Sequence, residues 1–593
     1  MTLENIISNG VSNAIKALYS SDFPSENVSV QETKKEFTGD RTVVVFPFLR
    51  MSKTSPELTA EAIGNALLND LSEVVGFNVV KGFLNLEIDS NYWINFLEES
   101  SSNPKFGFKP ANSESEIMVE YSSPNTNKPL HLGHLRNNFL GYAVAEILKA
   151  NGHKIYKVQI INDRGIHICK SMVAWQKFGE GETPESSGIK GDKLVGKYYV
   201  RFDQEYKTQI KGLVSNGSSQ ETAEKTAPIL SEAQEMLRKW EAKDPEVYAL
   251  WKKMNSWVYG GFEHTYTEMG VDFDKLYYES NTYLKGKEEV EKGLASGALF
   301  KKDDGSVWCD LTGDGLDEKL VLRGDGTAVY MTQDIGTAIL RFQDYPNLGY
   351  QIYTVGNEQE YHFKVLFLIL EKLGFSQAKS NLHLSYGMVE LPEGKMKSRE
   401  GTVVDADDLL AEMIDTARKE AESKGKLDDL SEDEKYDTFK KIGYGALKYY
   451  LLKVDPRKGM MFNPAESVDF QGNTGPFIQY TNVRANAILK KANALSDTIK
   501  RDLDISDSEK QVIKRLYDYS AVLAESAKLY NPGVLANYIY ELVKDYNSFY
   551  QSTNILKEQD EDLVSLRLHF SRLTANVIKS GMKLLGIDMP ERM

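Results

Sequence analysis

Two histidines three residues apart, His131 and His134, are the side chains in this sequence best placed for chemistry. They open a long segment whose apolar residues recur with helical spacing. Free N–H groups and the dipole at a helix start attract anions, and Gly133 leaves room for a flat ring against the backbone. Lys128 lies three residues before His131 and can reach the same anion. The pattern predicts a nucleotide pocket; the alternative is a pair of surface histidines without a role.

A second cationic segment lies far downstream, at residues 391–404. Gly394 and Gly401 bracket Lys395, Lys397, Ser398 and Arg399 in this segment. Such a loop can close over a polyphosphate and neutralise the charge that develops on a pyrophosphate leaving group. Taken alone it is equally well explained as an exposed basic turn. A histidine tetrad and a Lys/Ser loop in one chain are a rarer combination, which favours the functional interpretation of both.

The elements around the histidines indicate a doubly wound sheet. An apolar run at residues 117–121 precedes the histidine helix and another at 156–161 follows it, which favours a right-handed parallel crossover. Further strand-like segments alternate with helical ones. The strands are expected at residues 320–322, 328–331, 350–355 and 382–389, and the helices at 335–342 and 362–373. We therefore expect an α/β fold with a doubly wound, Rossmann-type parallel sheet.

The chain length of 593 residues predicts several domains. Residues 1–112 show an amphipathic helix followed by strand-like stretches at 43–49 and 79–86, which indicates an α+β domain. Residues 113–405 carry the sheet, interrupted at about 170–265 by a Lys/Glu-rich helical insertion. Residues 406–593 have helical periodicity almost throughout, which indicates an all-α domain.

Composition indicates a soluble globular protein of a reducing compartment. The chain is 41% apolar and 26% charged, and its longest apolar runs are too short for a bilayer. Its first residues lack the pattern of a secretory signal. Cys169 and Cys309 have no CxxC spacing, and no metal-ligand cluster is evident. We expect a cytoplasmic protein without a membrane partner and without a metal site.

The net charge of −15 argues mildly against a nucleic-acid partner, although a basic stripe on one face suffices to bind RNA. Two candidate stripes are present, each equally well explained as a solvated helix face. They are Lys440, Lys441, Lys448, Lys453, Arg457 and Lys458, and Arg484, Lys490 and Lys491.

Together these motifs resemble those of class I aminoacyl-tRNA synthetases. The tetrad His131–His134 is similar to their HIGH motif, and the segment around Lys395–Arg399 is similar to their KMSKS loop. Within that class the chain resembles the arginyl-tRNA synthetases from about residue 75 to its last residue. The residues that carry this narrower resemblance are Ser123–Asn125, Lys128–Asn137, Asp325–Thr327, Tyr330, Thr332, Asp334, Ile335, Gly356, Gln359, His362, Phe363, Gly472–Pro476, Gln479, Tyr480, Arg484, Leu585–Ile587 and Pro590–Met593.

The resemblance implies a two-step ligase. L-Arginine would attack the α-phosphorus of ATP to give arginyl-adenylate and pyrophosphate, and the 3′-terminal ribose of tRNA would then accept the arginyl group. Magnesium would arrive with ATP, no metal would be held by the protein itself, and we expect a monomer. The first domain would contact tRNA, and the helical C-terminal domain would bind the anticodon.

Residue roles follow from the same resemblance. His131, His134, Lys128 and Lys397 would be catalytic, with Lys128 compensating for Gly394, which stands where the KMSKS loop has its first lysine. The residues expected to bind ATP are Leu132, Gly133, Met388, Lys395 and Ser398. Those expected to bind arginine are Glu120, Asn125, Tyr330, Asp334 and Gln359, and those expected to bind tRNA are Tyr480, Asn482 and Arg484.

Carboxylates and carbonyl oxygens are also the groups that best match the planar donor fork of a guanidinium. Simpler roles remain open for individual residues: Asp334 would also serve as the cap of a helix from Ile335, and Tyr330 or Tyr480 as packed core.

Two other functions remain open at this stage. One is a small-molecule ligase or nucleotidyltransferase of the same fold, which would have no use for the long helical C-terminal region. The other is a catalytically silent tRNA-binding relative, against which the intact His131, His134, Lys128 and Lys397 argue.

Overall fold

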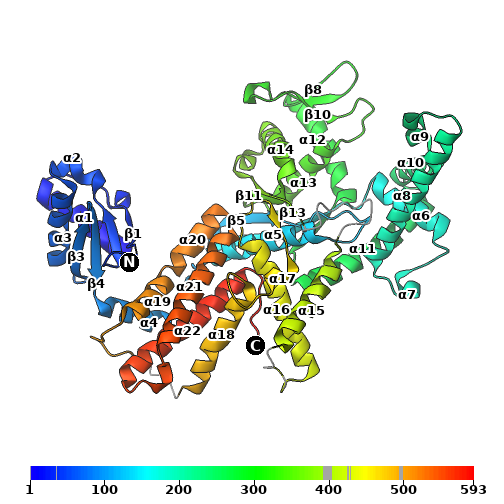
Figure 1. Cartoon of the computed structure of the whole chain (residues 1–593). Helices are drawn as coiled ribbons and strands as arrows, with labels where there is room; N and C mark the ends of the chain where they lie inside the picture. Colours follow the sequence, from blue (N-terminus) through cyan, green and yellow to red (C-terminus); the bar gives the residue numbers. More distant parts are fainter. Residues whose placement is uncertain (1, 35, 391–403, 424–426, 428, 493–497) are drawn as a thin grey trace. The chain divides into compact units, whose positions relative to one another are not determined.

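The computed structural model describes residues 2–34, 36–390, 404–423, 427, 429–492 and 498–593, without the side chains of 113–115. Its chain folds into two compact units (Figure 1). The first contains residues 1–106, 484–519 and 541–577, and the second contains 107–483, 520–540 and 578–593. The N-terminal segment therefore shares its unit with helical segments from the C-terminal third of the chain.

The first unit contains a four-stranded antiparallel sheet in the order β1-β2-β4-β3. The expected amphipathic helix is present, and the stretch at 79–86 falls on two strands, β3 and β4. Of the stretch expected at 43–49 only the first two residues are strand, because a 3-10 turn at Phe46–Phe48 and a helix from Leu49 follow. The helices are α1 (Leu3–Tyr19), α2 (Leu49–Ser52), α3 (Pro56–Asp70), α4 (Ser90–Ser100) and α19 (Asp507–Tyr517). The strands are β1 (Val30–Glu32), β2 (Arg41–Val44), β3 (Val74–Val80) and β4 (Phe83–Ile88). Lys81 and Gly82 have φ of 51° and 78°, as a tight hairpin between β3 and β4 requires.

The second unit is built on a five-stranded parallel sheet in the order β12-β11-β5-β6-β7. Its strands are β5 (Asn112–Glu120), β6 (His153–Ile161), β7 (Lys275–Tyr278), β11 (Leu348–Gly356) and β12 (Leu382–Tyr386). Counted along the chain this order is 3-2-1-4-5, which confirms the doubly wound prediction. The order reverses between β5 and β11, and ligands bind outside the carboxyl ends of strands at such a point.

Helices connect the parallel strands. They are α5 (Leu132–Ala150), α6 (Ile166–Phe178), α12 (Glu279–Ser296), α13 (Tyr330–Asp344) and α14 (Glu360–Lys372). Between β6 and β7 the chain forms the expected helical insertion, which Figure 1 shows as a lobe standing off the sheet. It contains α7 (Pro184–Ser187), α8 (Gly191–Ser215), α9 (Gln220–Thr226), α10 (Pro228–Glu241) and α11 (Pro245–Met269).

Two of the strands expected in the parallel sheet do not belong to it. The segment at 320–322 belongs to a separate antiparallel sheet of order β10-β9-β8, not to the parallel sheet. Its strands are β8 (Phe300–Lys301), β9 (Val307–Cys309) and β10 (Lys319–Leu322). The strand expected at 328–331 is wrong: Ala328 forms a single bridge to Leu322, and α13 begins at Tyr330. Thr332 accepts a hydrogen bond from the N–H of Val329 at 2.9 Å and so starts this helix.

Helices α12 and α13 cross at unusually short range because both have glycine at the crossing. A Cβ on Gly286 would meet the carbonyl oxygen of Thr332 at 1.9 Å, and one on Gly336 would meet the nitrogen of Gly286 at 2.4 Å. No larger residue fits without a backbone shift. This crossing sets the position of α13 above the sheet.

From Asp405 onward the chain is almost wholly helical, as expected. The helices are α15 (Ala406–Glu422), α16 (Glu432–Leu452), α17 (Pro464–Ser467), α18 (Gly475–Lys491), α20 (Tyr519–Leu529), α21 (Pro532–Ser552) and α22 (Glu561–Leu584). A short strand pair, β13 (Val389–Glu390) with β14 (Met460–Met461), interrupts them. None of the described helices combines the length and apolar character needed to cross a membrane.

Candidate active site

The two histidines stand at the start of α5, as the sequence predicts. His131 is the N-cap residue, and its Nδ1 accepts a hydrogen bond from the N–H of Gly133 at 3.2 Å. The N–H of His131 donates to Nδ1 of His134 at 3.1 Å, and the two ring centroids are 3.9 Å apart. Each histidine therefore uses Nδ1 to cap the helix.

This capping fixes the chemistry of both rings. Burial and the neighbouring charge of Lys128 lower the pKa of His131 to about 3, and burial together with His131 and Lys128 lowers the pKa of His134. A neutral imidazole whose Nδ1 accepts a hydrogen bond carries its proton on Nε2. Both histidines thus offer a neutral Nε2–H donor at the positive end of a helix.

Helix α5 is held against the sheet by polar side chains on its inner face. Asn137 donates to the carbonyl of Thr354 at 2.6 Å and accepts from the N–H of Ser122 at 2.6 Å. These bonds join the carboxyl ends of β11 and β5, the strands between which the order reverses. Arg136, 1% exposed, donates to the carbonyl of Lys458 at 2.8 Å. The histidines are therefore fixed at the switch point.

Lys395, Lys397 and Ser398, the predicted loop residues, lie outside the described part of the chain. The residues on either side of that segment are described. The N–H of Leu132 donates to the carbonyl of Val404 at 3.3 Å, and the carbonyl of Met388 accepts from Arg136 at 3.4 Å. Met388 is 52% exposed. The described residues Met388 and Val404, on either side of that segment, thus contact α5, the helix that carries the histidines.

A cavity of about 440 Å³ opens at the same edge of the sheet, and all five residues predicted to bind arginine line it. We call it the acidic cavity because Glu120, Glu279, Asp334 and Glu358 are among its lining residues. The others are Ser123, Asn125, Ile160, Asn162, Tyr330, Gln333, Thr337, Arg341, Tyr353, Val355, Gln359, Phe363 and Leu366. The cavity collects residues from β5, β6, β11, α12, α13 and α14.

Asp334 lies one turn into α13, so its side chain faces the cavity and does not cap a helix. The expectation that it caps a helix from Ile335 is wrong, because α13 begins at Tyr330, five residues before Ile335. His362 on α14 lies 2.6 Å from Asp334 through Nε2, and its ring is 4.9 Å from that of Tyr330. Tyr330 is 61% exposed, so the alternative of a packed core side chain is wrong. The nearby charge of Asp334 raises the pKa of Tyr330, which keeps it protonated as a donor. His362 holds Asp334 in place.

Glu279 is a cavity residue that the sequence analysis missed. It is the first residue of α12, directly after β7. Burial raises its pKa to about 7; Arg164 opposes this shift, and Asp163 and Asp334 add to it. Its position after the strand end Tyr277-Tyr278 is the signal that could have identified it.

Arg341 is the second residue that was missed. It is fully buried on α13 and forms an ion pair with Glu120 at the end of β5. An arginine within an apolar helical pattern, 221 residues from its partner, carries no local signal in the sequence.

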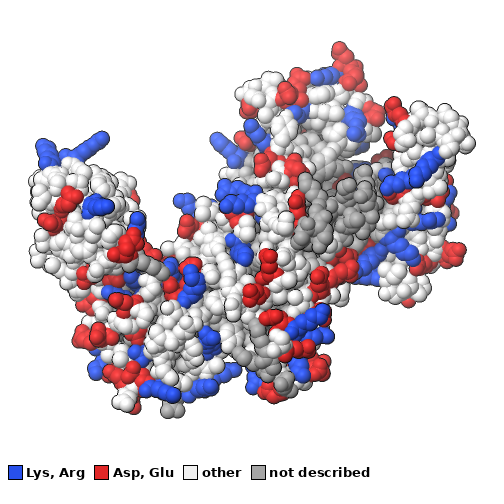
Figure 2. Space-filling model, in the orientation of Figure 1, with Lys and Arg blue, Asp and Glu red and all other residues white. Residues whose placement is uncertain are grey.

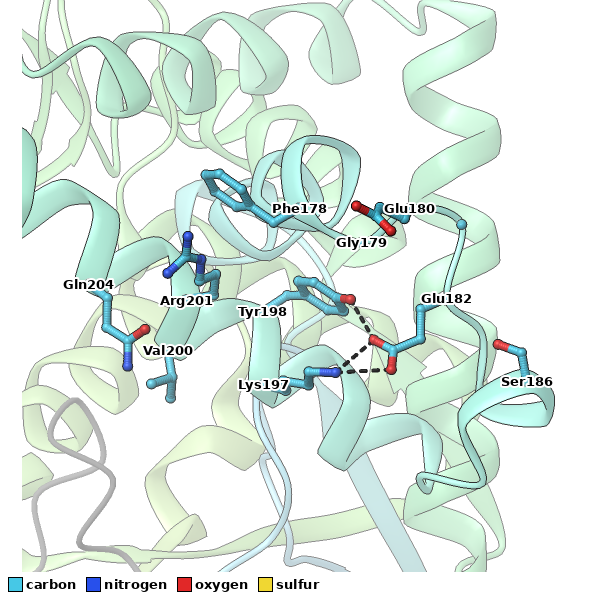
Figure 3. A pocket seen from close by; sticks show the side chains of 11 residues that line it. Phe178, Gly179, Glu180, Glu182, Ser186, Lys197, Tyr198, Val200, Arg201 and Gln204 are labelled. Carbon is cyan, nitrogen blue, oxygen red and sulfur yellow. Dashed lines mark hydrogen bonds and ion pairs between the residues drawn. The ribbon is translucent and has the colours of Figure 1, made fainter.

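A further cavity lies beside His131, and another adjoins it. A small cavity of about 210 Å³ is lined by Lys128 and His131 together with residues of α8 and Asp405. A larger one of about 940 Å³, the insertion cavity, lies between α6 and α8 (Figure 3). In it Lys197 and Tyr198 donate to Glu182 at 2.8 and 2.5 Å, and Arg201 stacks over Phe178 at 4.6 Å. Lys197 and Val200 line both cavities, so the two adjoin.

The residues predicted to bind tRNA lie on α18. Asn482 is 2% exposed, and Tyr480 is half-buried. Arg484 donates to Asn547 at 2.6 Å and stacks over Tyr550 at 4.9 Å. Of these side chains, that of Asn482 is too buried to reach a base in this conformation.

The first basic stripe is not a continuous charged surface. Lys448 is 5% exposed, Lys440 pairs with Glu268 at 2.8 Å, and Lys441 pairs with Asp437 at 2.6 Å. Figure 2 shows basic and acidic side chains interleaved over the face in view. Among the described residues no group of three or more His, Cys, Asp or Glu side chains is placed to hold a metal ion.

Comparison with known proteins identifies both halves of the chain. Residues 101–463 match the family described as tRNA synthetases class I (R), catalytic domain, and residues 478–593 match the DALR anticodon binding domain. The arginine–tRNA ligase of Bacteroides fragilis is 56% identical over 598 residues, and that of Flavobacterium psychrophilum is 58% identical over 604 residues. Both alignments cover 100% of this chain and 100% of the relative.

Solved structures show the same fold. The Thermus thermophilus arginyl-tRNA synthetase superposes with a TM-score of 0.80 at 24% identity, covering 100% of both chains. The Plasmodium falciparum arginyl-tRNA synthetase superposes with a TM-score of 0.76 at 17% identity, covering 100% of this chain and 99% of the other.

Proposed function

The chain belongs to the arginyl-tRNA synthetase family, and we propose that its acidic cavity and its two capping histidines form the site where arginine is activated and passed to tRNA. The activity is that of an ATP-dependent arginine–tRNA ligase. The observation that carries the assignment of the site is the convergence of Glu120, Asn125, Tyr330, Asp334 and Gln359 on one cavity beside the start of α5. The matched anticodon-binding domain argues against a small-molecule ligase.

The guanidinium of arginine would enter between Asp334 and Glu279, with the Tyr330 hydroxyl beside them. Two carboxylates and a hydroxyl suit a planar fork of donors. Lysine presents a point charge and would leave acceptors of this cavity unpaired, at a cost of roughly 1–3 kcal/mol for each buried group. Glu120 and Asn125, from the opposite wall, would hold the α-ammonium and carboxylate ends.

ATP would lie over the start of α5, with its adenine against Gly133 and beside Met388. The arginine carboxylate would attack the α-phosphorus in line, and pyrophosphate would leave. The Nε2–H groups of His131 and His134 would donate to oxygens that become more negative in the transition state. Lys128, which lines the small cavity together with His131, supplies positive charge. Lys395, Lys397 and Ser398 would add further contacts to the phosphates. Catalysis of the reaction then depends on orientation and charge neutralisation, without a nucleophile from the protein.

The 3′ end of tRNA would approach through the insertion cavity. Its volume of about 940 Å³ accommodates a nucleotide, and it adjoins the small cavity at Lys197 and Val200. The Arg201–Phe178 stack offers a flat surface to an unstacked base. We expect Arg201→Ala to raise the KM for tRNA severalfold, with the KM values for arginine and ATP unchanged. An unchanged KM for tRNA would place the strand elsewhere.

Domain boundaries, tRNA contacts and assembly are part of the proposal. We propose a tRNA-contacting N-terminal domain at 1–112, a catalytic domain at 113–405 and an anticodon-binding domain at 406–593 that uses Tyr480, Arg484 and, after local opening, Asn482. Magnesium would arrive bound to ATP. We also propose a monomer in the cytoplasm, since Cys169 and Cys309 are buried free thiols of the kind that a reducing compartment preserves.

The test is charging of total tRNA by the purified protein with labelled arginine, ATP and magnesium, with lysine and glutamine in parallel. The expected result is charging with arginine alone. Charging with another amino acid would overturn the assignment of the acidic cavity. ATP binding without charging would indicate the catalytically silent relative.

A further inference from the structure

The cavity proposed for substrate arginine contains an arginine of the chain itself. Arg341 lines the acidic cavity and is 0% exposed, and its Nη2 donates to Oε2 of Glu120, which is 5% exposed. An ion pair removed from water is an expensive feature, and apolar residues of similar volume often serve stability as well or better. Because this ion pair lies in the wall of a binding site, we expect its role to lie in substrate binding.

Among the described residues, Glu120 is the hydrogen-bond partner of the Arg341 side chain. The rings of Tyr277 and Tyr353 lie 5.1 and 5.6 Å from its guanidinium carbon. Within the described residues its Nε and Nη1 have no hydrogen-bond partner. The aromatic rings hold the planar group by cation–π contact, so Nη2 is directed at Glu120. Tyr353 also pairs with Glu120 in the register of β11 and β5, which brings all three residues together.

One carboxylate oxygen of Glu120 accepts a hydrogen bond from Arg341, and the other is available to a ligand. Oε2 accepts from Arg341, while Oε1 has no hydrogen-bond partner among the described residues. A buried carboxylate needs a counter-charge to remain ionised, and a bond to one oxygen fixes its rotamer. The free oxygen of a carboxylate held in this way is suited to accept from an ammonium group.

We infer that Arg341 is a positioning residue for arginine activation: it pairs with Glu120 and orients it so that Glu120 recognises the α-ammonium of the substrate. The inference rests on the proposed role of Glu120. It also gives the substrate a direction. The pair of Arg341 and Glu120 is neutral overall, whereas Asp334 faces the cavity with His362 as its hydrogen-bond partner in the described structure. The substrate guanidinium is therefore drawn to the α12–α13 end and the ammonium to β5.

The test compares two arginine analogues as competitive inhibitors of charging. Agmatine keeps the guanidinium and an amine but has no carboxylate, and 5-guanidinopentanoate keeps the guanidinium and the carboxylate but has no amine. In Arg341→Met the inhibition constant of agmatine should rise roughly tenfold or more, while that of 5-guanidinopentanoate should change by less than about threefold. Arg341→Lys retains the charge without the planar fork. Its inhibition constant for agmatine should lie between those of the wild type and of Arg341→Met.

The controls separate this role from damage to the fold and from an error in the proposed site. Arg323→Met makes the same chemical change at an exposed position and should alter neither constant. Thermal unfolding and ATP affinity of each variant report on the fold; if Arg341→Met unfolds early, the ratio of the two constants is measured in Arg341→Lys. If the inhibition constants of both analogues rose by equal factors, Arg341 would be purely structural and the inference would be overturned.

Glu120→Gln provides the last distinction. If the inhibition constant of agmatine rises in Glu120→Gln but stays at the wild-type value in the Arg341 variants, the inference fails and the proposed role of Glu120 stands. If the inhibition constant of agmatine is unchanged in Glu120→Gln as well, the proposed role of Glu120 fails together with the inference.

Discussion

The acidic cavity and the histidine pair lie at the same edge of one sheet and are built in opposite ways. The cavity gathers four carboxylates from four separate elements, with Glu120 and Glu279 far apart in the chain, and the pKa of Glu279 is raised to about 7. The histidine pair arises within four residues and consists of neutral rings that cap a helix. A site that must take a cation beside a polyphosphate can thus keep acids on one side and neutral or cationic donors on the other.

The comparison predicts that the two regions fail differently, and the largest effect is expected in the cavity. Asp334→Asn removes a partly buried charge that faces the guanidinium. This should cost about 2–5 kcal/mol, or roughly 30- to 5000-fold in kcat/KM for arginine. The KM for ATP should stay near that of the wild type. Steady-state charging kinetics test this, with the exposed Asp303→Asn as the control. A matching rise in the KM for ATP would contradict the division of roles.

The histidine pair should show the complementary defect. In His134→Asn the amide oxygen can still accept from the His131 N–H, but the Nε2–H donor is lost. We expect kcat to fall roughly 100-fold, the usual scale for one transition-state donor, with little change in the KM for arginine. The exposed His264→Asn on α11 is the matched control. A defect confined to the KM for arginine would mean that His134 does not serve ATP chemistry.

The regions should also differ in their response to pH. Below its pKa of about 7, Glu279 carries a proton that it must release to bind a guanidinium, so the KM for arginine should rise as the pH falls. Between about pH 8 and about pH 6 the expected rise is roughly tenfold. The KM for ATP, at saturating magnesium, should stay flat over this range because the pKa of His131 is about 3. Glu279→Gln should abolish the arginine dependence; a slope that persists would assign it to another group.

The smallest effect tests how the cavity is held open. Gly286→Ala places a Cβ against the Thr332 carbonyl and forces α12 from α13, which should cost about 1–3 kcal/mol of unfolding free energy and raise the KM for arginine severalfold. Gly260→Ala on α11 meets no atom within 4 Å and should be neutral or mildly stabilising. Denaturant unfolding and charging kinetics measure both. Equal stabilities of the two variants would show that the crossing tolerates a larger spacing.

The same contrast explains what the sequence could reveal. His131, Gly133 and His134 are adjacent in the chain, so their spacing predicted a helix start and its chemistry. The parallel sheet followed from apolar runs that alternate with helical segments. Glu279 and Arg341 acquire their roles only through partners that the fold brings together, and the Gly286–Gly336 crossing has no counterpart in local spacing. The misplaced strand at 328–331 failed because Thr332 starts a helix inside an apolar stretch.

The central claim is that arginine occupies the acidic cavity while the adenylate lies over the start of α5. A crystal structure of the protein with a non-hydrolysable arginyl-adenylate analogue tests it most directly. The account predicts the guanidinium within hydrogen-bonding distance of Asp334 and Glu279, the α-ammonium at Glu120, and the adenine against Gly133. A guanidinium bound at Glu120, or an adenine away from the start of α5, would contradict it.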